Sequence, residues 1–224
     1  MWWPSPQTSL PVHTVGATSG RPLELGLPDG SLIVLQDGSE LSYPDPFEES
    51  ATRWVEISGE AYFKVAPDAR KPFQVRTAYA TVEVLGTAFN VRALPGEPEV
   101  EVTVESGLVQ LSSSAAPDNK LQLQAGERGL CTPEGDLRKA PDAEINAISW
   151  LTDKLRFRNT PLPQAIEALC RHYGIAIEME KESLKACTYT GSFEKTALKD
   201  VLQTLELTFG ARMVHQGEGQ YLLK

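Results

Sequence analysis

The chain has 224 residues, of which 41% are hydrophobic and 23% are charged, which is typical of a chain that folds in water. This length allows one large domain or two smaller ones. The net charge of -9 argues against nucleic acid as a partner, because binding a phosphate backbone requires clustered lysines and arginines. No run of about 18 apolar residues occurs, so the sequence predicts no membrane-spanning helix within it.

Residues 13–42 alternate between strand and turn signals. Leu23 and Leu25 flank a glutamate, residues 27–30 read Leu-Pro-Asp-Gly, and an apolar burst follows at 32–35. Proline and glycine suit a tight turn, so this stretch predicts a hairpin. Pro44 and Pro46 then interrupt the pairing, because proline has no amide hydrogen to donate to a strand ladder.

Residues 59–91 form the most ordered part of the pattern. Apolar and polar residues alternate there in short bursts separated by Gly59, Gly86 and the Pro67-Asp68 turn. A period of two indicates half-buried strands, so we expect three strands of one antiparallel sheet.

A further alternation occupies residues 99–105. Val100, Val102 and Val104 are expected to face the core, and the intervening glutamates to face water. Strand signals recur every 8 to 12 residues as far as residue 132. We therefore predict a mainly β domain over residues 10–132, built as an antiparallel sandwich or a wound β-structure. Residues 133–150 contain prolines, a glycine and many charges, which indicates a linker.

The C-terminal part changes to a helical period and contains a repeat. Apolar residues lie on one helical face over residues 162–173 and again over 198–209. Adding 36 to a residue number superimposes the two copies, for example Phe157 on Phe193 and Gly174 on Gly210. We expect Asn159 or Thr160 to cap the first helix, with Pro161 as its first residue, and Thr196 to cap the second.

Strand-like segments flank both predicted helices. The pattern predicts a small α+β domain over residues 151–224, made of two β-α-β units whose helices pack on one common sheet. Such a sheet leaves one face or an edge strand free to bind a partner. The candidate partner-binding strand is the last one, formed by Gln220, Tyr221, Leu222 and Leu223.

The residues carry no recognisable catalytic or metal-binding motif. Cys131, Cys170 and Cys187 lack a CxxC spacing, although a disulfide between the last two remains an alternative. The three histidines (His13, His172 and His215) are scattered, so we expect no metal and no cofactor. We expect His172 to carry partial positive charge that suits the end of its helix.

Two alternatives remain open for function. A hydrolase would need a pair of carboxylates, for which Glu60 and the Glu48-Glu49 pair are the candidates. Solvated carboxylates, with Glu60 in a structural hydrogen bond or salt bridge, are the simpler interpretation, so we expect no enzyme. A β-rich carbohydrate or cell-wall binding module would instead expose Trp54 or Tyr79 in a groove.

The order of several motifs resembles the FecR family of bacterial anti-sigma regulators. These motifs are LPDGS, GEAYFKV, KPFQV, VLGTAFNV, VESGLVQL and LQAGER, between residues 27 and 128. Residues 155–179 and 188–207 are similar to the small signalling domain that follows FecR in Bacteroidetes members, akin to the N-terminal (STN) domain of secretins and TonB-dependent transporters. The resemblance covers nearly the whole chain.

The resemblance implies a periplasmic sensor. Such a protein senses the loaded state of an outer-membrane TonB-dependent transporter through the transporter's signalling domain, and controls an extracytoplasmic-function (ECF) sigma factor. Family members carry a cytoplasmic sigma-binding segment and one inner-membrane helix before the FecR domain. Neither is recognisable here, so this chain is expected to correspond to the periplasmic half. Trp2 and Trp3 would suit the outer end of a removed membrane span, or they are two stray aromatic residues at the chain's start.

Overall fold

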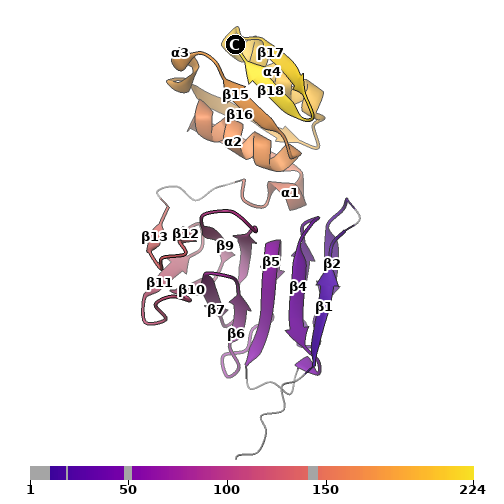
Figure 1. Ribbon diagram of the computed structural model, residues 1–224, viewed down its shortest axis with the longest axis vertical. Coiled ribbons are helices and arrows are strands. Elements are labelled where there is room, and N and C mark those ends of the chain that lie inside the picture. The colour runs from indigo at the N-terminus through magenta and orange to yellow at the C-terminus, as the bar shows by residue number, and fades with distance from the viewer. Residues whose placement is uncertain (1–10, 19, 48–51, 141–145) are drawn as a thin grey trace, which may run out of the picture. The chain divides into compact units, whose positions relative to one another are not determined.

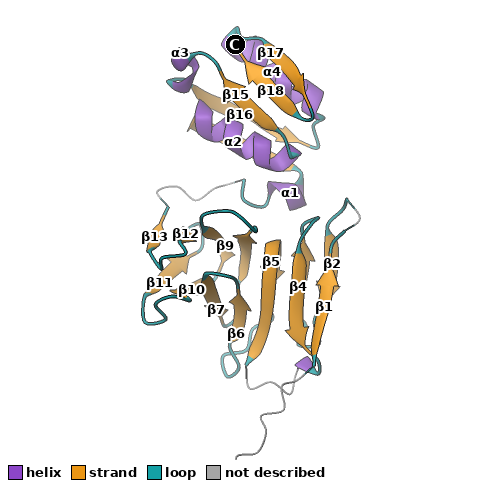
Figure 2. Cartoon of the chain, in the orientation of Figure 1, coloured by secondary structure: helices purple, strands orange, loops and turns teal. Residues whose placement is uncertain are grey.

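The computed structural model describes residues 11–18, 20–47, 52–140 and 146–224. Trp2, Trp3 and the Glu48-Glu49 pair lie outside the described residues. The chain divides into two compact units, Met1–Glu144 and Ile145–Lys224, which we call the β unit and the C-terminal unit. Strands make up most of the β unit, and the two long helices belong to the C-terminal unit (Figures 1 and 2).

Two sheets build the β unit and share one long strand, β5 (Arg53–Lys64). Sheet A also contains β1 (Val12–Gly16), β4 (Glu40–Pro44), β6 (Phe73–Arg76), β7 (Ala80–Val84), β10 (Leu108–Ser113) and β11 (Lys120–Gln124). Sheet B also contains β2 (Leu23–Gly26), β3 (Leu32–Leu35), β8 (Ala88–Ala93), β9 (Val100–Ser106), β12 (Arg128–Cys131) and β13 (Leu137–Lys139). The predicted mainly β fold is confirmed, as is the hairpin of β2 and β3.

Strand β5 turns a corner between the two sheets. Its first half pairs with β4 and β6 in sheet A, and its second half pairs with β3 and β8 in sheet B. A straight strand of this length would hold its ends roughly 36 Å apart. Yet the Arg53 Nη1 atom, at the start of β5, donates to the carbonyl of Ala66 just past its end at 2.9 Å. The strand therefore folds back on itself.

Gly59 lies at this corner, inside β5, so the prediction that it separates two strands is wrong. Its φ of 122° is unfavourable for any other residue. A Cβ atom on Gly59 would lie only 2.4 Å from Ser39 Oγ and 2.7 Å from Ser39 Cα. The Ser39 hydroxyl occupies that space, accepts the Glu60 amide hydrogen at 2.8 Å and donates to the Glu60 carbonyl at 3.0 Å. Ser39 thus replaces the strand partner that β5 loses where it bends.

The corner also corrects the expected pairing. Strands β5 and β6 are parallel, whereas a wholly antiparallel arrangement was predicted for residues 59–91. After the corner the chain crosses back from sheet B and enters sheet A beside the first half of β5, in the same direction. Because the chain passes once around both sheets, β6 becomes a parallel neighbour of β5 without a connecting helix. The local alternation of apolar and polar residues cannot reveal this pairing.

The core of the β unit lies between the two sheets. Val55 from the first half of β5 and Phe63 from the second half are both fully buried in it, and the Phe63 ring stacks on Phe89 with centroids 5.1 Å apart. A Cβ on Gly129 of β12 would approach Leu123 of β11 to 2.7 Å, so the sheets pack closely there. Val100, Val102 and Val104 are buried as predicted.

Two details of the β unit differ from expectation. Glu101 does not face water: it is 8% exposed, and Arg128 Nη1 lies 3.2 Å from its carboxylate, because β12 pairs alongside β9. Strand β13 lies in the stretch predicted as a linker. It pairs with β12, so residues 137–139 are part of sheet B.

The C-terminal unit contains the two predicted helices and two separate small sheets. In chain order its elements are α1 (Ser149–Thr152), β14 (Lys154–Pro161), α2 (Leu162–Tyr173), β15 (Ala176–Met179), α3 (Glu182–Lys185), β16 (Thr188–Glu194), α4 (Leu198–Phe209), β17 (Met213–Gly217) and β18 (Gln220–Leu223). The helices α2 and α4 begin and end 36 residues apart, and both end at a left-handed glycine.

The sheet arrangement and the helix caps were predicted wrongly. The strands before the helices, β14 and β16, pair with each other, and the strands after them form a second sheet in the order β15-β18-β17. Pro161 and Ala197 occupy the capping positions, and neither helix has a side-chain cap. Strand β14 extends to Pro161, so Thr160 is part of the strand and not of a helix cap. Its hydroxyl accepts the Arg158 amide hydrogen.

Gly59→Ala should destabilise the β unit by about 3 kcal/mol, because the new methyl group overlaps Ser39 and the φ angle is strained. Gly26→Ala in β2 is the matched control, since nothing lies within 4 Å of its Cβ position. Urea unfolding of both variants tests this. Equal stability of the two variants would contradict the role assigned to the corner.

Candidate interaction surfaces

Glu60, the candidate carboxylate of the hydrolase alternative, is buried in a polar cluster. It is 1% exposed, accepts a hydrogen bond from Asn90 Nδ2 at 2.8 Å, and lies 3.2 Å from Arg92 Nη1. Arg92 also pairs with Glu97 at the surface. The predicted structural hydrogen bond and salt bridge are confirmed, and both bind Glu60 to the neighbouring strand β8.

Trp54 lies half-buried on the outward face of sheet A, where the carbohydrate-binding alternative would need an open aromatic ring. The guanidinium of Arg76 lies over this ring, 4.6 Å from its centroid. A sugar on that side would have to displace the cation.

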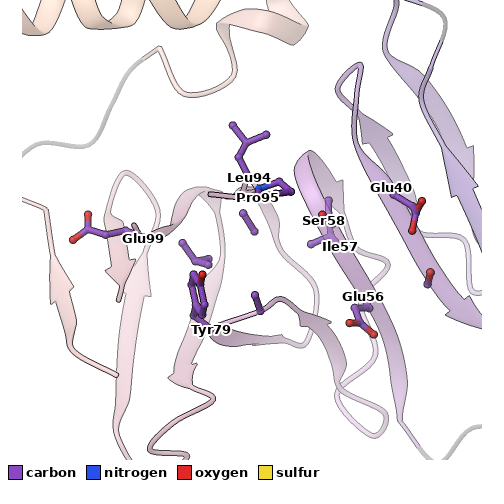
Figure 3. Close-up of a pocket in the computed structure, with 12 residues that line it drawn as sticks. Glu40, Glu56, Ile57, Ser58, Tyr79, Leu94, Pro95 and Glu99 are labelled. Carbon is purple, nitrogen blue, oxygen red and sulfur yellow. The ribbon is translucent and has the colours of Figure 1, made fainter. Parts of the chain in front are cut away.

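Tyr79 is also half-buried, and it lines a cavity of about 370 Å³ in the β unit. We call this the corner cavity, because Ile57 and Ser58 of β5 line it immediately before Gly59. Glu40 and Glu56 approach it from β4 and β5, while Glu99, Leu94 and Pro95 come from the end of β8 and the following loop. Figure 3 shows Tyr79 between the glutamates of β4 and β5 on one side and Glu99 on the other.

In the C-terminal unit, the candidate strand β18 is not an edge strand. It pairs in parallel with β15 on one side and antiparallel with β17 on the other, so its backbone is used on both sides. The prediction of an edge at Gln220, Tyr221, Leu222 and Leu223 is therefore wrong. A contact through their outward side chains stays a prediction.

On three of the four true edge strands, at least one outward amide is occupied. On β14, the Asn146 side chain accepts the Arg156 amide hydrogen at 2.8 Å and donates to the Arg156 carbonyl at 3.0 Å. On β15, the Ile177 amide points to the Cys170 thiol. On β17, the Met213 amide donates to Glu206 at 2.6 Å. These contacts block pairing with another strand at those points.

Strand β16 has the open edge. Because Arg156 directs its backbone groups to Asn146, the Arg156/Ser192 pair is a non-hydrogen-bonded pair of the antiparallel ladder. The Ser192 amide and carbonyl must then also point away from β14. Among the described residues, no hydrogen bond occupies these two groups. Ser192 therefore presents a donor and an acceptor to an incoming strand.

The exposed side chains of β14, the strand paired with β16, are basic. Lys154, Arg156 and Arg158 alternate along β14 and are all exposed. Lys154 pairs with Glu194 at 2.9 Å, and Arg156 also interacts electrostatically with Glu194, although no ion pair of either arginine within 4 Å is found among the described residues. The LRFRN segment carried this signal in the sequence, but only the strand pairing places the arginines one strand away from the open edge of β16.

The remaining candidates carry no site. Cys131, Cys170 and Cys187 are free thiols, so the disulfide alternative does not hold here. Over the described ranges, no group of three or more His, Cys, Asp and Glu side chains is placed to hold a metal ion. Within the same ranges, no helix has the length and apolar character needed to cross a membrane.

His172 differs from expectation, because its half-buried ring favours the neutral form. Burial lowers the pKa of His172 from its ordinary value of 6.5, and the Asp153 carboxylate and the Ser149 backbone only partly oppose this. A partly charged imidazole that complements the helix dipole is therefore not what the structure supports.

The fold defines a two-unit protein with a wound β unit and a small α+β unit, and comparison with known proteins identifies its family. The family described as FecR protein matches residues 13–110, and the family FecR, C-terminal matches residues 154–222. No curated protein matches the chain.

Two solved structures agree with this result. Both bear the name "putative anti-sigma factor" from Parabacteroides distasonis ATCC 8503, and both are 30% identical to this chain, covering 95% of it and 98% of their own length. Their TM-scores are 0.71 and 0.70. The chain belongs to the FecR family of anti-sigma factors. It is therefore a regulator, and its family implies a sigma factor as partner.

Glu60→Gln should lower the free energy of unfolding by about 3 kcal/mol at pH 7, because Arg92 loses a buried counter-charge. Glu97→Gln, which removes the more exposed partner of the same arginine, should cost about 1 kcal/mol or less. Chemical denaturation measures both. If Glu60→Gln were as stable as the parent chain, the buried pair would not stabilise the fold.

The C-terminal unit should become less stable as the pH is lowered, because His172 then becomes protonated. Because the folded-state pKa of His172 is lowered, the unfolded chain binds the proton more readily, so stability is retained above the ordinary value of 6.5 and lost as pH decreases below it. His172→Gln should weaken this dependence. Urea titrations between pH 7.5 and 5.5, followed by amide signals of α2 and α4, provide the measurement; an unchanged pH profile in the variant would contradict the assignment.

Proposed function

We propose that this chain is the periplasmic sensor region of a transmembrane anti-sigma regulator. It transmits the loaded state of an outer-membrane TonB-dependent transporter to an ECF sigma factor by protein-protein contact. Membership of the FecR family supports the regulatory part of this function. The transporter, the ECF class of the sigma factor and the periplasmic location are our inference from the family resemblance.

The observation that carries the partner-binding part is the open edge of β16. An added strand can form backbone hydrogen bonds with Ser192, while Arg156 and Arg158 attract acidic side chains on the same face. The occupied outward amides on β14 and β17 make those edges less complete than the edge of β16, which favours β16. We therefore propose β16 as the docking edge, in place of the last strand, β18.

The alternative function, a carbohydrate or cell-wall binding module, has less support. Its best platform, Trp54, lies under the Arg76 guanidinium, and Tyr79 lies in an acidic cavity. Aromatic residues hold sugars through exposed stacking faces, and here the Trp54 face is covered by a cation while Tyr79 is a single half-buried ring among carboxylates.

Ser192→Pro tests the proposed contact. Proline removes the outward amide hydrogen and obstructs an incoming strand, while the bonds from β16 to β14 stay intact. Isothermal titration of the chain with the purified signalling domain of the transporter encoded beside it should give binding that Ser192→Pro weakens at least about tenfold.

His215→Pro is the matched control. Arg212 and Lys224 exchange both backbone hydrogen bonds, so the His215 amide, three residues further along the ladder, points away from β18. This variant removes an outward amide from a different edge and should bind normally. Loss of binding in His215→Pro alone would move the contact to β17. No binding by the parent chain to any adjacent transporter would overturn the proposed function.

A further inference from the structure

The corner cavity is a consequence of the change of partners along β5. On the side that faces β6 and β8, the ladder with β6 ends at Glu56 and the ladder with β8 begins at Gly59. Ile57 and Ser58 lie between them and pair with no strand on that side within the described part of the chain. The opening is therefore built into the fold, because two sheets that diverge from one strand cannot both remain paired at the corner.

The walls of the cavity combine apolar surface with one aromatic ring. Leu94, Pro95 and Tyr79 line it, and the Tyr79 backbone is fixed because its carbonyl accepts hydrogen bonds from Ser114 and from the Cys131 thiol. The Tyr79 hydroxyl has no hydrogen-bond partner among the residues that the structure describes. A ring held in this way can lie against a flat cation or an aliphatic stem.

The carboxylates at the cavity differ in whether a protein cation neutralises them. Glu99 accepts both hydrogen bonds of Arg138, at 2.7 and 2.9 Å. Glu40 and Glu56, on adjacent strands, have no ion-pair partner in the described ranges. Arg76, which is opposite Glu56 in the β5–β6 ladder, has its guanidinium over the Trp54 ring.

The charge of the whole β unit favours the same kind of ligand. Residues 1–144 contain 21 acidic and 11 basic side chains, whereas residues 145–224 contain 9 acidic and 10 basic ones. The negative charge of the chain is therefore concentrated in the β unit. A cation that approaches the cavity gains from this field as well as from the two nearby carboxylates.

From these observations we propose that the corner cavity binds the side chain of an arginine presented by a partner protein. The guanidinium lies between Glu40 and Glu56, its planar face meets the Tyr79 ring, and its methylene stem lies along Leu94 and Pro95. An arginine suits the site better than a lysine, because a planar cation can hydrogen-bond two carboxylates and stack on a ring at once. This site is separate from the β16 edge and does not depend on the proposed function.

A peptide titration tests this proposal on the intact chain. The probe is acetyl-Gly-Arg-Gly-amide, and the matched control is the same peptide with citrulline, which has nearly the same shape and no charge. Two-dimensional amide NMR spectra should show shifts confined to Ile57, Ser58, Tyr79 and Leu94, with a dissociation constant on the order of 1 mM for so small a ligand. The citrulline peptide should bind at least about tenfold more weakly than the arginine peptide.

Two variants and a control locate the cation. Glu40→Gln and Glu56→Gln should each weaken the arginine peptide about fivefold, because each removes one charged acceptor. Glu24→Gln removes an exposed carboxylate from β2 and should leave the affinity unchanged. Absence of shifts, shifts at other residues, equal binding of the citrulline peptide, or equal loss in Glu24→Gln would each overturn the proposal. If free methylguanidine bound as tightly as the peptide, the cavity would be a site for small cations, and the proposal of a protein partner would be overturned.

Discussion

The contact between Ser39 and the backbone of Glu60 holds the corner on which the β unit depends. A strand that leaves one sheet and enters another must lose its neighbours where it bends, and its amide and carbonyl groups then need other partners. The Ser39 hydroxyl supplies both, and it can approach closely only because residue 59 has no side chain. Without this contact, the Glu60 amide would be buried without its partner where the two sheets separate, and the Glu60 carbonyl would keep only the hydrogen bond from the Gln36 amide, at 2.9 Å.

The same corner explains features that are far apart in the sequence. It brings the start and the end of β5 together, so that Arg53 can hydrogen-bond the carbonyls of Ala66 and Lys71 and pair with Asp29. It sets β6 parallel to β5. It also directs Glu60 towards Asn90 and Arg92 on β8, which makes this carboxylate a structural group. The corner cavity is lined by residues of the same bend, and among the described residues Glu40 and Glu56 have no ion-pair partner.

The C-terminal unit illustrates how a small domain controls its strand edges. The unit contains one two-stranded sheet and one three-stranded sheet, which together have four edge strands. Unprotected edge strands allow unwanted pairing with other chains. Side chains or thiols occupy at least one outward amide on each of β14, β15 and β17, and β16 is left open at Ser192, next to the strand that carries Arg156 and Arg158. This partial protection of three edges favours strand addition at β16, and such a preference is what a selective protein-protein contact requires.

The sequence by itself determined the local elements: the alternating valines of β9, the hairpin of β2 and β3, and the two helices related by 36 residues. Each depends on side chains a few positions apart, so its period is visible in the chain. The tertiary structure alone decided that Gly59 bends a continuous strand, that β5 and β6 are parallel, and that β18 is central. The corner cavity and the open edge at Ser192 belong to this second group. Their residues come from separate segments, and strand register, which is a long-range property, brings them together.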